Sequence, residues 1–222
     1  EDQAERAFEE NALQPERLAR QCRQHGVHFT YISTSYVFDG REGPYTEDAT
    51  PNPVNVYSRS KWAGEQRVQS ACEGAALIPR VICVYGAEAR RKNFAFQVQR
   101  ALTEGQTLRL PSDQQGNPSD ARDLARWILA LIARCAAGVW HLGGPRPDCT
   151  RIEWTEMLVG AFAQNGRRRH PGFAMHAVPT AVLQQRAPRP LRAGMWTRKL
   201  DRLGLPPTEV ATSIREMLRQ DR

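Results

Sequence analysis

The sequence has no long apolar run and few cysteines, and each shortage excludes a class of protein. No stretch approaches the roughly 18 apolar residues of a membrane-spanning helix, and no charged, apolar, small-residue signal pattern opens the chain. The cysteines are odd in number and widely spaced, without a C-x-x-C pair; they are Cys22, Cys72, Cys83, Cys135 and Cys149. Such usage is typical of free thiols in a reducing compartment. We therefore expect a soluble, cytoplasmic protein with no membrane partner.

Several further signatures are missing. The histidines lack cysteine or carboxylate partners at the spacing of a zinc site, so we expect no metal. There is no G-x-x-G-x-x-G turn of the kind that brings backbone close to a cofactor pyrophosphate. There is also no internal repeat and no low-complexity tract. Because the chain begins with Glu1 rather than Met, we interpret it as a fragment of a longer protein that holds this turn, and we expect these 222 residues alone to be inactive as an enzyme.

The net charge of +7 is unevenly divided along the chain. Residues 1–86 carry 9 Lys+Arg against 12 Asp+Glu, a net −3, whereas residues 87–222 carry 22 against 12, a net +10. A basic half of this kind can bind nucleic acid, but it contains neither zinc-finger spacing nor the aromatic-interleaved basic motif of an RNA-binding sheet. We therefore expect no nucleic-acid partner, and we interpret the excess as solvated surface together with a pocket for an anion.

Hydroxyl side chains follow the first apolar run of the chain. The run over 27–32 is typical of a buried parallel strand, and it ends at Ser33, Thr34 and Ser35. In open α/β sheets, ligands bind at the carboxyl ends of the strands. These hydroxyls therefore indicate a binding site, and the loop over 39–53, rich in Gly, Pro and Asp, would shape its mouth.

A tyrosine and a lysine follow this loop at helical spacing. Residues 54–63 contain no Gly or Pro, so we expect a helix on which Tyr57 and Lys61, four apart, share one face. An ammonium near a phenol favours the phenolate and lowers the tyrosine pKa from its usual value of about 10. The pair is therefore suited to donating a proton near neutral pH.

The sequence of this region resembles that of a known family. The segments ISTSYVFDG, PYTE and PNPVNVYSRSKWAGE are similar to the extended short-chain dehydrogenase/reductases, and most closely to the dTDP-4-dehydrorhamnose reductase branch (RmlD-like). The resemblance implies reduction of the 4-keto group of a nucleotide-diphosphate deoxysugar by NADPH or NADH, in dTDP-L-rhamnose biosynthesis. In it Thr34 polarises the ketone and Tyr57 gives the proton. Lys61 holds the nicotinamide ribose and tunes Tyr57.

The resemblance implies further site residues. Ser33 and Arg80, with Tyr57 and Lys61, would bind the cofactor. The substrate would contact Ser35, Val37, Phe38, Cys83, Tyr85, Asn93, Phe94 and Arg189. The chain departs from the family pattern around the substrate, because Ser35 replaces an Asp, Cys83 replaces a Trp, and Arg192 with Ala193 replace Asn-Ser. The identity of the sugar is therefore left open.

The order of elements predicts an α/β protein. Helical periodicity over 2–24, interrupted by Pro15, is followed by the strand at 27–32, the Tyr57 helix and a second buried strand over 76–86. Later we expect a loop and then a helix within 89–106, and a short strand, a turn and an amphipathic helix within 107–133. A strand at 138–144, which carries a packed or loop-edge His141, and helices at 152–166 and 207–220 follow. We interpret the fold as a doubly wound, Rossmann-like parallel sheet without its N-terminal half.

The predicted division follows this order. Residues 1–86 would form the C-terminal half of the NAD(P)-binding domain, onto which 119–145 packs back. Residues 87–222 would mainly form a smaller lobe that binds the nucleotide-diphosphate sugar. Two other functions remain open: a non-catalytic binding subunit, like the regulatory subunit of methionine adenosyltransferase, and another nucleotide-sugar epimerase or reductase. A homodimer is also left open.

Overall fold

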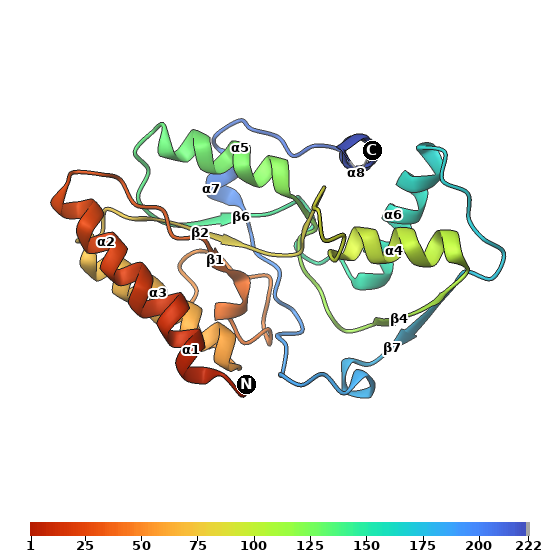
Figure 1. Cartoon of the computed structure of the whole chain (residues 1–222), viewed down its shortest axis with the longest axis horizontal. Helices are drawn as coiled ribbons and strands as arrows, with labels where there is room; N and C mark the ends of the chain where they lie inside the picture. Colours follow the sequence, from red (N-terminus) through yellow and green to blue (C-terminus); the bar gives the residue numbers. More distant parts are fainter. Residues whose placement is uncertain (221–222) are drawn as a thin grey trace.

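The computed structural model describes residues 1–220 (Figure 1). The helices are α1 (Ala4–Phe8), α2 (Gln14–Gln24), α3 (Val56–Ala71), α4 (Phe94–Glu104), α5 (Ala121–Ile132), α6 (Arg151–Gln164), α7 (Arg198–Asp201) and α8 (Val210–Gln220). The strands are β1 (Ser33–Thr34), β2 (Leu77–Val81), β3 (Val84–Tyr85), β4 (Thr107–Pro111), β5 (Ser119–Asp120), β6 (Gly138–Leu142) and β7 (Ala174–Val178). Shorter helical turns are η1 (Glu9–Leu13), η2 (Ser35–Val37) and η3 (Thr180–Leu183). Every helix of this part of the chain is too short or too polar to cross a lipid bilayer.

A parallel sheet in the order β1-β2-β6 forms the centre of the first half of the molecule. Strands far apart in sequence are joined here through helical connections, as a doubly wound α/β fold requires. The fold class predicted from the sequence is therefore confirmed, and β6, from the 119–145 segment, pairs with β2 along its whole length.

The first strand lies later in the chain than predicted. Val27 and Ile32 are 57% and 52% exposed, and before β1 only Thr30 bridges to β2. Within residues 1–220, β1 has a strand partner on one side only, so the run over 27–32 is half solvated. Our expectation of a buried strand is therefore wrong for Val27 and Ile32. Residues 29–31 do pair with β2, because Tyr31 N donates to the Leu77 carbonyl (2.9 Å) and Leu77 N donates to the Phe29 carbonyl (3.0 Å), and β1 continues this pairing.

Alternate residues of β2 serve opposite faces of this sheet. Ile78 packs with Ala19 and Val68 in a core under α2 and α3. Leu77 packs on the other face with Trp127 of α5 and Leu142 of β6. Figure 1 shows the corresponding layers, with α1, α2 and α3 on one side of the sheet and α5 on the other. The sheet is thus covered on both faces, and its strand ends point toward the second half of the molecule.

The predicted strand over 76–86 is in fact two strands with different partners. β2 ends at Val81, and Cys83 then has a left-handed backbone with a φ of 48°. Beyond this turn β3 leaves the main sheet and pairs with β5. A positive φ is costly for a residue with a side chain and interrupts an extended strand. The change of partner opens the sheet at Cys83.

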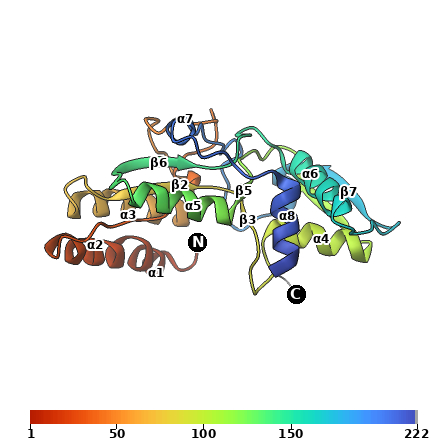
Figure 2. The same cartoon turned by 90° about the horizontal axis from the view of Figure 1, so that it is seen from above.

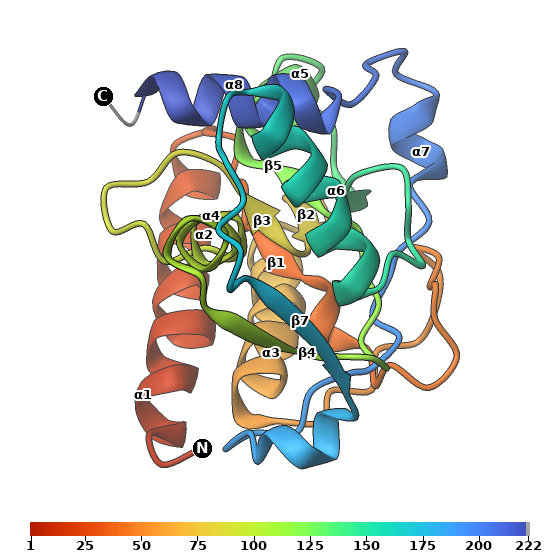
Figure 3. The same cartoon turned by 90° about the vertical axis from the view of Figure 1, so that its right-hand side faces the viewer.

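A second lobe lies beside the sheet in Figure 2 and is seen end-on in Figure 3. Strands β4 and β7 pair in parallel, and α4, α6 and α8 enclose a core that includes Phe96, Trp154, Phe162 and Met217. The strand β7 was not predicted from the sequence, because its residues are all exposed or half-buried and His176 interrupts its short apolar run. The other expected elements of the lobe lie within a few residues of their predicted positions.

The N-terminal helix is divided before Pro15, as its sequence predicts. The π-helical turn η1 precedes α2, because proline lacks the N–H that would continue the regular hydrogen bonds. From η1, Asn11 donates to Ser60 Oγ on α3 (3.1 Å), and its carbonyl accepts from the Tyr31 hydroxyl (2.6 Å). A Cβ added at Gly64 would collide with both acceptor and hydroxyl, so glycine is required there. These contacts fix α3 against the sheet.

Candidate functional site

An asparagine cap sets the start of α3 and hence the place of its tyrosine. The Asn55 side chain accepts from Ser58 N (2.8 Å), and Ser58 Oγ accepts from Asn55 N (3.1 Å). This reciprocal capping box satisfies N–H groups that the helix cannot pair itself. Tyr57 therefore lies in the first turn, and Lys61 lies one turn later on the same side.

Tyr57 lies beside the hydroxyl of β1. Its side chain is 48% exposed, and its ring meets that of Tyr36 edge to face with centroids 6.5 Å apart. Partial burial raises the pKa of the Tyr57 phenol, and a hydrogen bond with Thr34 acts in the opposite direction. Thr34 also accepts from Tyr36 N (3.2 Å). The phenol and the threonine hydroxyl therefore converge at the carboxyl end of β1.

Lys61 does not lower the pKa of Tyr57 in this structure, and that expectation is wrong. Its Nζ donates to the Ile32 carbonyl (2.6 Å) and lies 4.0 Å from the centroid of the Tyr31 ring. Burial lowers the pKa of Lys61 to about 8, and the Glu65 carboxylate acts in the opposite direction. The ammonium is thus held at the strand by a backbone carbonyl and an aromatic face, where it titrates close to neutral pH.

Two of the four residues expected to bind the cofactor lie in the interior. Arg80 and Glu65 form an ion pair of 2.6 Å in which each side chain is 2% exposed. The Ser33 hydroxyl donates to the same carboxylate. The Arg80 guanidinium also faces the rings of Phe38 and Trp62. Ser33 and Arg80 therefore support the sheet beneath the site, whereas Tyr57 and Lys61 reach its open edge.

Three residues expected to contact the substrate, at and just after η2, are also buried. Ser35, Val37 and Phe38 have no exposed surface, and Phe38 stacks on Tyr45 with ring centroids 4.2 Å apart. His141 meets Phe38 edge to face and is fully buried, which confirms that it is a packed histidine. These side chains position the turn after β1, and it is Tyr36 of this turn that faces outward.

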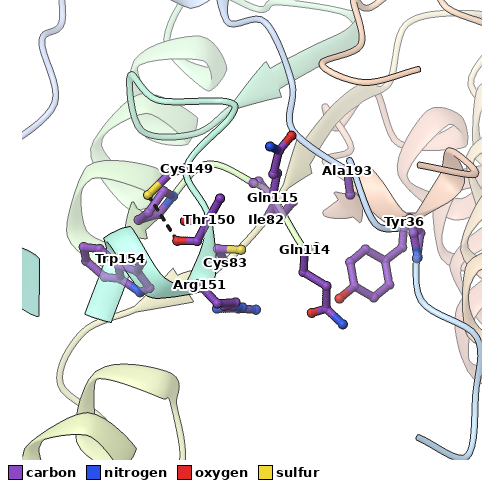
Figure 4. Close-up of a pocket in the computed structure, with 13 residues that line it drawn as sticks. Tyr36, Ile82, Cys83, Gln114, Gln115, Cys149, Thr150, Arg151, Trp154 and Ala193 are labelled. Atoms are coloured by element: carbon purple, nitrogen blue, oxygen red, sulfur yellow. Dashed lines mark hydrogen bonds between the residues drawn. The ribbon is translucent and has the colours of Figure 1, made fainter. Parts of the chain in front are cut away.

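A pocket opens between the end of β2 and the start of α6 (Figure 4). It is lined by Tyr36, Ile82, Cys83, Gln114, Gln115, Gly116, Pro118, Cys149, Thr150, Arg151, Trp154, Pro190 and Ala193. Figure 4 shows Tyr36 and Gln114 on one side of it, Trp154 on the other, and Cys83 between them. Because Tyr36 also touches Tyr57, the pocket and the tyrosine–threonine pair adjoin.

The remaining predicted substrate residues divide between this pocket and its surroundings. Cys83 lines it, whereas Tyr85 is buried against Trp154 with ring centroids 4.7 Å apart. Asn93 caps α4 and donates to the Gly86 carbonyl (2.7 Å). The guanidinium of Arg151 lies over the ring of Phe94 in a cation–π contact. Arg189 is exposed and is not among the lining residues. A binding role for these residues outside the pocket lining stays a prediction.

The segment 188–193 closes one side of the pocket. Arg192 N donates to the Gly40 carbonyl (2.9 Å), and Gln115 N donates to the Leu191 carbonyl (2.7 Å). Asn55 also donates to the Pro188 carbonyl (2.8 Å), so the cap of α3 holds this segment as well. Gly40 has a φ of 76° and leaves no room for a Cβ beside Pro190. The segment thus joins the loop after β1 to the lobe.

Sequence reasoning missed Tyr36, Gln114, Thr150 and Arg151. One usable signal was the sequence T-x-x-E at Thr150, because this capping-box pattern predicts a helix start. The structure contains that box, with Glu153 N donating to Thr150 Oγ1 (3.2 Å) and Thr150 N donating to Glu153 (2.8 Å). The pattern places Arg151 at the first position of α6, at the edge of the pocket.

Comparison with known proteins identifies close relatives of two kinds. A dTDP-4-keto-6-deoxy-D-glucose reductase of Streptomyces niveus is 38% identical over 148 residues, which is 65% of this chain and 50% of that protein. Methionine adenosyltransferase 2 subunit beta of Xenopus tropicalis is 30% identical over 226 residues, which is 98% of this chain and 65% of that protein. The chain therefore spans between half and two thirds of the length of these relatives.

Solved structures agree with this relationship. A dTDP-4-dehydrorhamnose reductase of Bacillus anthracis, solved in complex with NADP, superposes with a TM-score of 0.81 at 26% identity and covers 95% of this chain and 72% of that one. A family model described as the RmlD substrate binding domain matches residues 1–222. The chain therefore belongs to the RmlD substrate-binding domain family.

Proposed function

We propose that the chain provides the proton-donating site of an NAD(P)H-dependent reductase that acts on the 4-keto group of a dTDP-linked deoxysugar, in dTDP-L-rhamnose biosynthesis in the cytoplasm. The observation that carries this proposal is the half-exposed Tyr57 phenol beside Thr34, next to a pocket at the open end of the sheet. The reductases among its relatives favour the same reaction.

In this reaction the nicotinamide would supply a hydride to the ketone carbon. Thr34 would hold the ketone oxygen through its hydroxyl, and Tyr57 would donate the proton that the oxygen needs as negative charge develops on it. A tyrosine whose pKa is raised by burial stays protonated at neutral pH, and it is therefore a loaded donor before the reaction begins. The Tyr36 ring restricts the phenol to this edge.

The residues present fit one end of the cofactor. Lys61 lies at the strand end with its ammonium on a single carbonyl, and it would turn its remaining N–H groups to the ribose hydroxyls. Ser33 and Arg80 would act indirectly, by fixing Glu65 and the strand beneath. The 222 residues contain no glycine-rich turn for the pyrophosphate. We propose that residues 1–86 with 119–145 serve the cofactor and that the rest of 87–222 serves the sugar.

The test is a Tyr57→Phe substitution in a protein that also carries the glycine-rich turn, assayed as NADPH oxidation with a dTDP-4-keto-6-deoxy sugar. The change removes one oxygen and keeps the ring, so the rate should fall by about 10²–10⁴ while the fold remains. Tyr45→Phe is the matched control, because its hydroxyl bonds to Asp39 outside the pocket. A Tyr57→Phe protein that keeps more than about a tenth of the parent rate lies outside the range of general acid catalysis and contradicts the proposal.

A second candidate function is a non-catalytic binding subunit. It is favoured by the match to methionine adenosyltransferase 2 subunit beta over 98% of the chain. It is also favoured by the finding that Lys61 does not lower the pKa of Tyr57. In that case the parent protein would show no NADPH oxidation with any 4-keto sugar. It would instead sediment together with a methionine adenosyltransferase catalytic subunit, and Tyr57→Phe would leave this association unchanged.

A further inference from the structure

Arg151 is the one charged side chain among the described residues that line the pocket. The others are apolar, aromatic, amide, thiol or hydroxyl groups. Figure 4 shows the Arg151 guanidinium at the mouth of the pocket, below Cys83 in that view. The pocket should therefore attract an anionic ligand, because no acidic side chain lines it to offset the positive charge of Arg151.

No carboxylate of residues 1–220 forms an ion pair with Arg151, since none lies within 4.0 Å of its guanidinium nitrogens. Glu153, the acidic residue of α6 that is nearest to Arg151 in sequence, is already engaged. It pairs with Arg146 (2.7 Å) and accepts from Thr150 N (2.8 Å). Arg146 faces a different cavity, so this ion pair lies behind the pocket wall. The charge of Arg151 is thus left for a ligand.

Two features hold Arg151 in place. Its guanidinium lies 4.9 Å from the centroid of the Phe94 ring, which restricts the planar group and reduces the entropy lost when it binds. Its backbone occupies the first turn of the 14-residue helix α6, where the first intrahelical bond is made by Trp154 N to Thr150 O (2.9 Å). The backbone N–H groups of Arg151 and Ile152 precede that bond and add donors on the same side.

We propose that Arg151 binds the diphosphate of the nucleotide sugar. The planar fork of guanidinium N–H groups matches phosphate oxygens in pairs, and the adjoining helix start favours negative charge. Arg189, predicted from the sequence to contact the substrate, lies outside the lining. The inference rests on the proposed function for the nucleotide sugar, and it adds the residue that recognises the anionic part.

Binding of dTDP to the 222-residue chain, measured by calorimetry at low salt, tests this inference without any turnover. Arg151→Gln should weaken binding about tenfold to a hundredfold, the loss of a charged hydrogen-bonded pair. Arg100→Gln is the matched control, because Arg100 is exposed on α4 outside the pocket. Arg151→Lys should keep part of the affinity, since it keeps the charge and loses the fork.

Thermal unfolding of each variant reports whether the fold is kept. If Arg151→Gln unfolds, Phe94→Leu replaces it as the test variant, and it should weaken dTDP binding severalfold.

Three outcomes would overturn the inference: a parent chain that does not bind dTDP, equal affinities of the parent and Arg151→Gln, or a loss that appears in Arg189→Gln instead. Glucuronate serves as a second probe, because a uronic acid could also place a carboxylate on Arg151. If only glucuronate binding depends on Arg151, the diphosphate assignment is wrong. Tyr57→Phe should bind dTDP as the parent does, so a failed reductase assay and a failed binding assay remain separate results.

Discussion

Ser33 and Thr34 are neighbours in β1, yet they belong to two different environments. Ser33 faces the interior, where it joins the Glu65–Arg80 ion pair, and Thr34 faces Tyr57 at the open edge. Side chains of a strand alternate between its two sides, so adjacent residues of one motif can have separate duties. Both residues are buried, but Ser33 supports an interior ion pair whereas the Thr34 hydroxyl lies against the half-exposed Tyr57.

The strongest way to separate the two environments is to remove one member of the buried pair. Arg80→Met should lower the free energy of unfolding by about 3–5 kcal/mol, because Glu65 would stay buried without its counter-ion. Urea denaturation measures this change. Tyr57→Phe, on the exposed side, should change it by less than about 0.5 kcal/mol. A double variant, Glu65→Leu with Arg80→Met, should recover most of the loss; equal losses in the single and double variants would mean that packing, and not charge, is responsible.

A pH titration tests the buried side through His141. Burial, assisted by the nearby Arg80 charge, lowers the pKa of His141 to about 3 from an ordinary 6.5. Below pH 6.5 the His141 imidazole therefore binds a proton in the unfolded chain but not in the folded chain. The free energy of unfolding falls as the pH is lowered toward 3. Between pH 6.5 and 5 the loss should be roughly 1.5 kcal/mol, since one pKa unit corresponds to about 1.4 kcal/mol. His141→Asn keeps a donor and should flatten this slope, and an unchanged slope would contradict the assignment.

Lys61 gives a matching titration on the exposed side. With a pKa of about 8, its ammonium is mostly present at pH 7 and mostly lost at pH 9. If the charged form holds the ribose, kcat/KM for ketone reduction should decline about tenfold over this range. Lys61→Arg, which stays protonated, should remove the decline. The midpoint near pH 8 can be followed separately by NMR of the lysine side chains, and a midpoint above pH 10 would count against the burial of this group.

The smallest expected effect lies where the two environments meet, at Asn55. Asn55→Ala removes the helix cap and should destabilise the protein by about 1 kcal/mol, as measured by thermal unfolding. Asn55→Asp keeps the cap acceptor but loses the donor to the Pro188 carbonyl. It should therefore retain most of the stability while loosening the segment 188–193. If both variants are equally unstable, the bond to Pro188 is the more important one.

Part of this organisation was visible in the sequence. The 54–63 segment, free of Gly and Pro, predicted the helix that carries Tyr57 and Lys61, and Pro15 predicted the break before α2. Arg80 also gave a sign that was not used. A charged residue inside the apolar run of β2 needs a buried partner, because charges are almost never fully buried alone. The position of Arg80 therefore indicates a buried carboxylate partner, which is Glu65, and not a bound cofactor.

Other features depend on partners that periodicity does not record. The apolar run over 76–86 is continuous in sequence, and only the left-handed backbone at Cys83 reveals that its second part pairs with β5. The direction of the Lys61 ammonium could not be predicted either, because a residue four positions from Tyr57 can reach the phenol or the strand. The Ile32 carbonyl and the Tyr31 ring decide between the two. The pocket lining comes from five separate segments, which only the fold brings together.

The segment 188–193 belongs to no strand, yet its backbone is tied to both halves of the protein through the Gly40 and Gln115 loops. The amides of Arg192 and Ala193 can therefore exchange with solvent deuterium only when their bonds to Gly40 and Gln115 open. Arg192 and Ala193 N–H groups, with that of Gln115, would act as built-in reporters. A ligand that closes the pocket should slow the exchange of all three together, which would make occupancy readable by mass spectrometry without any label on the ligand.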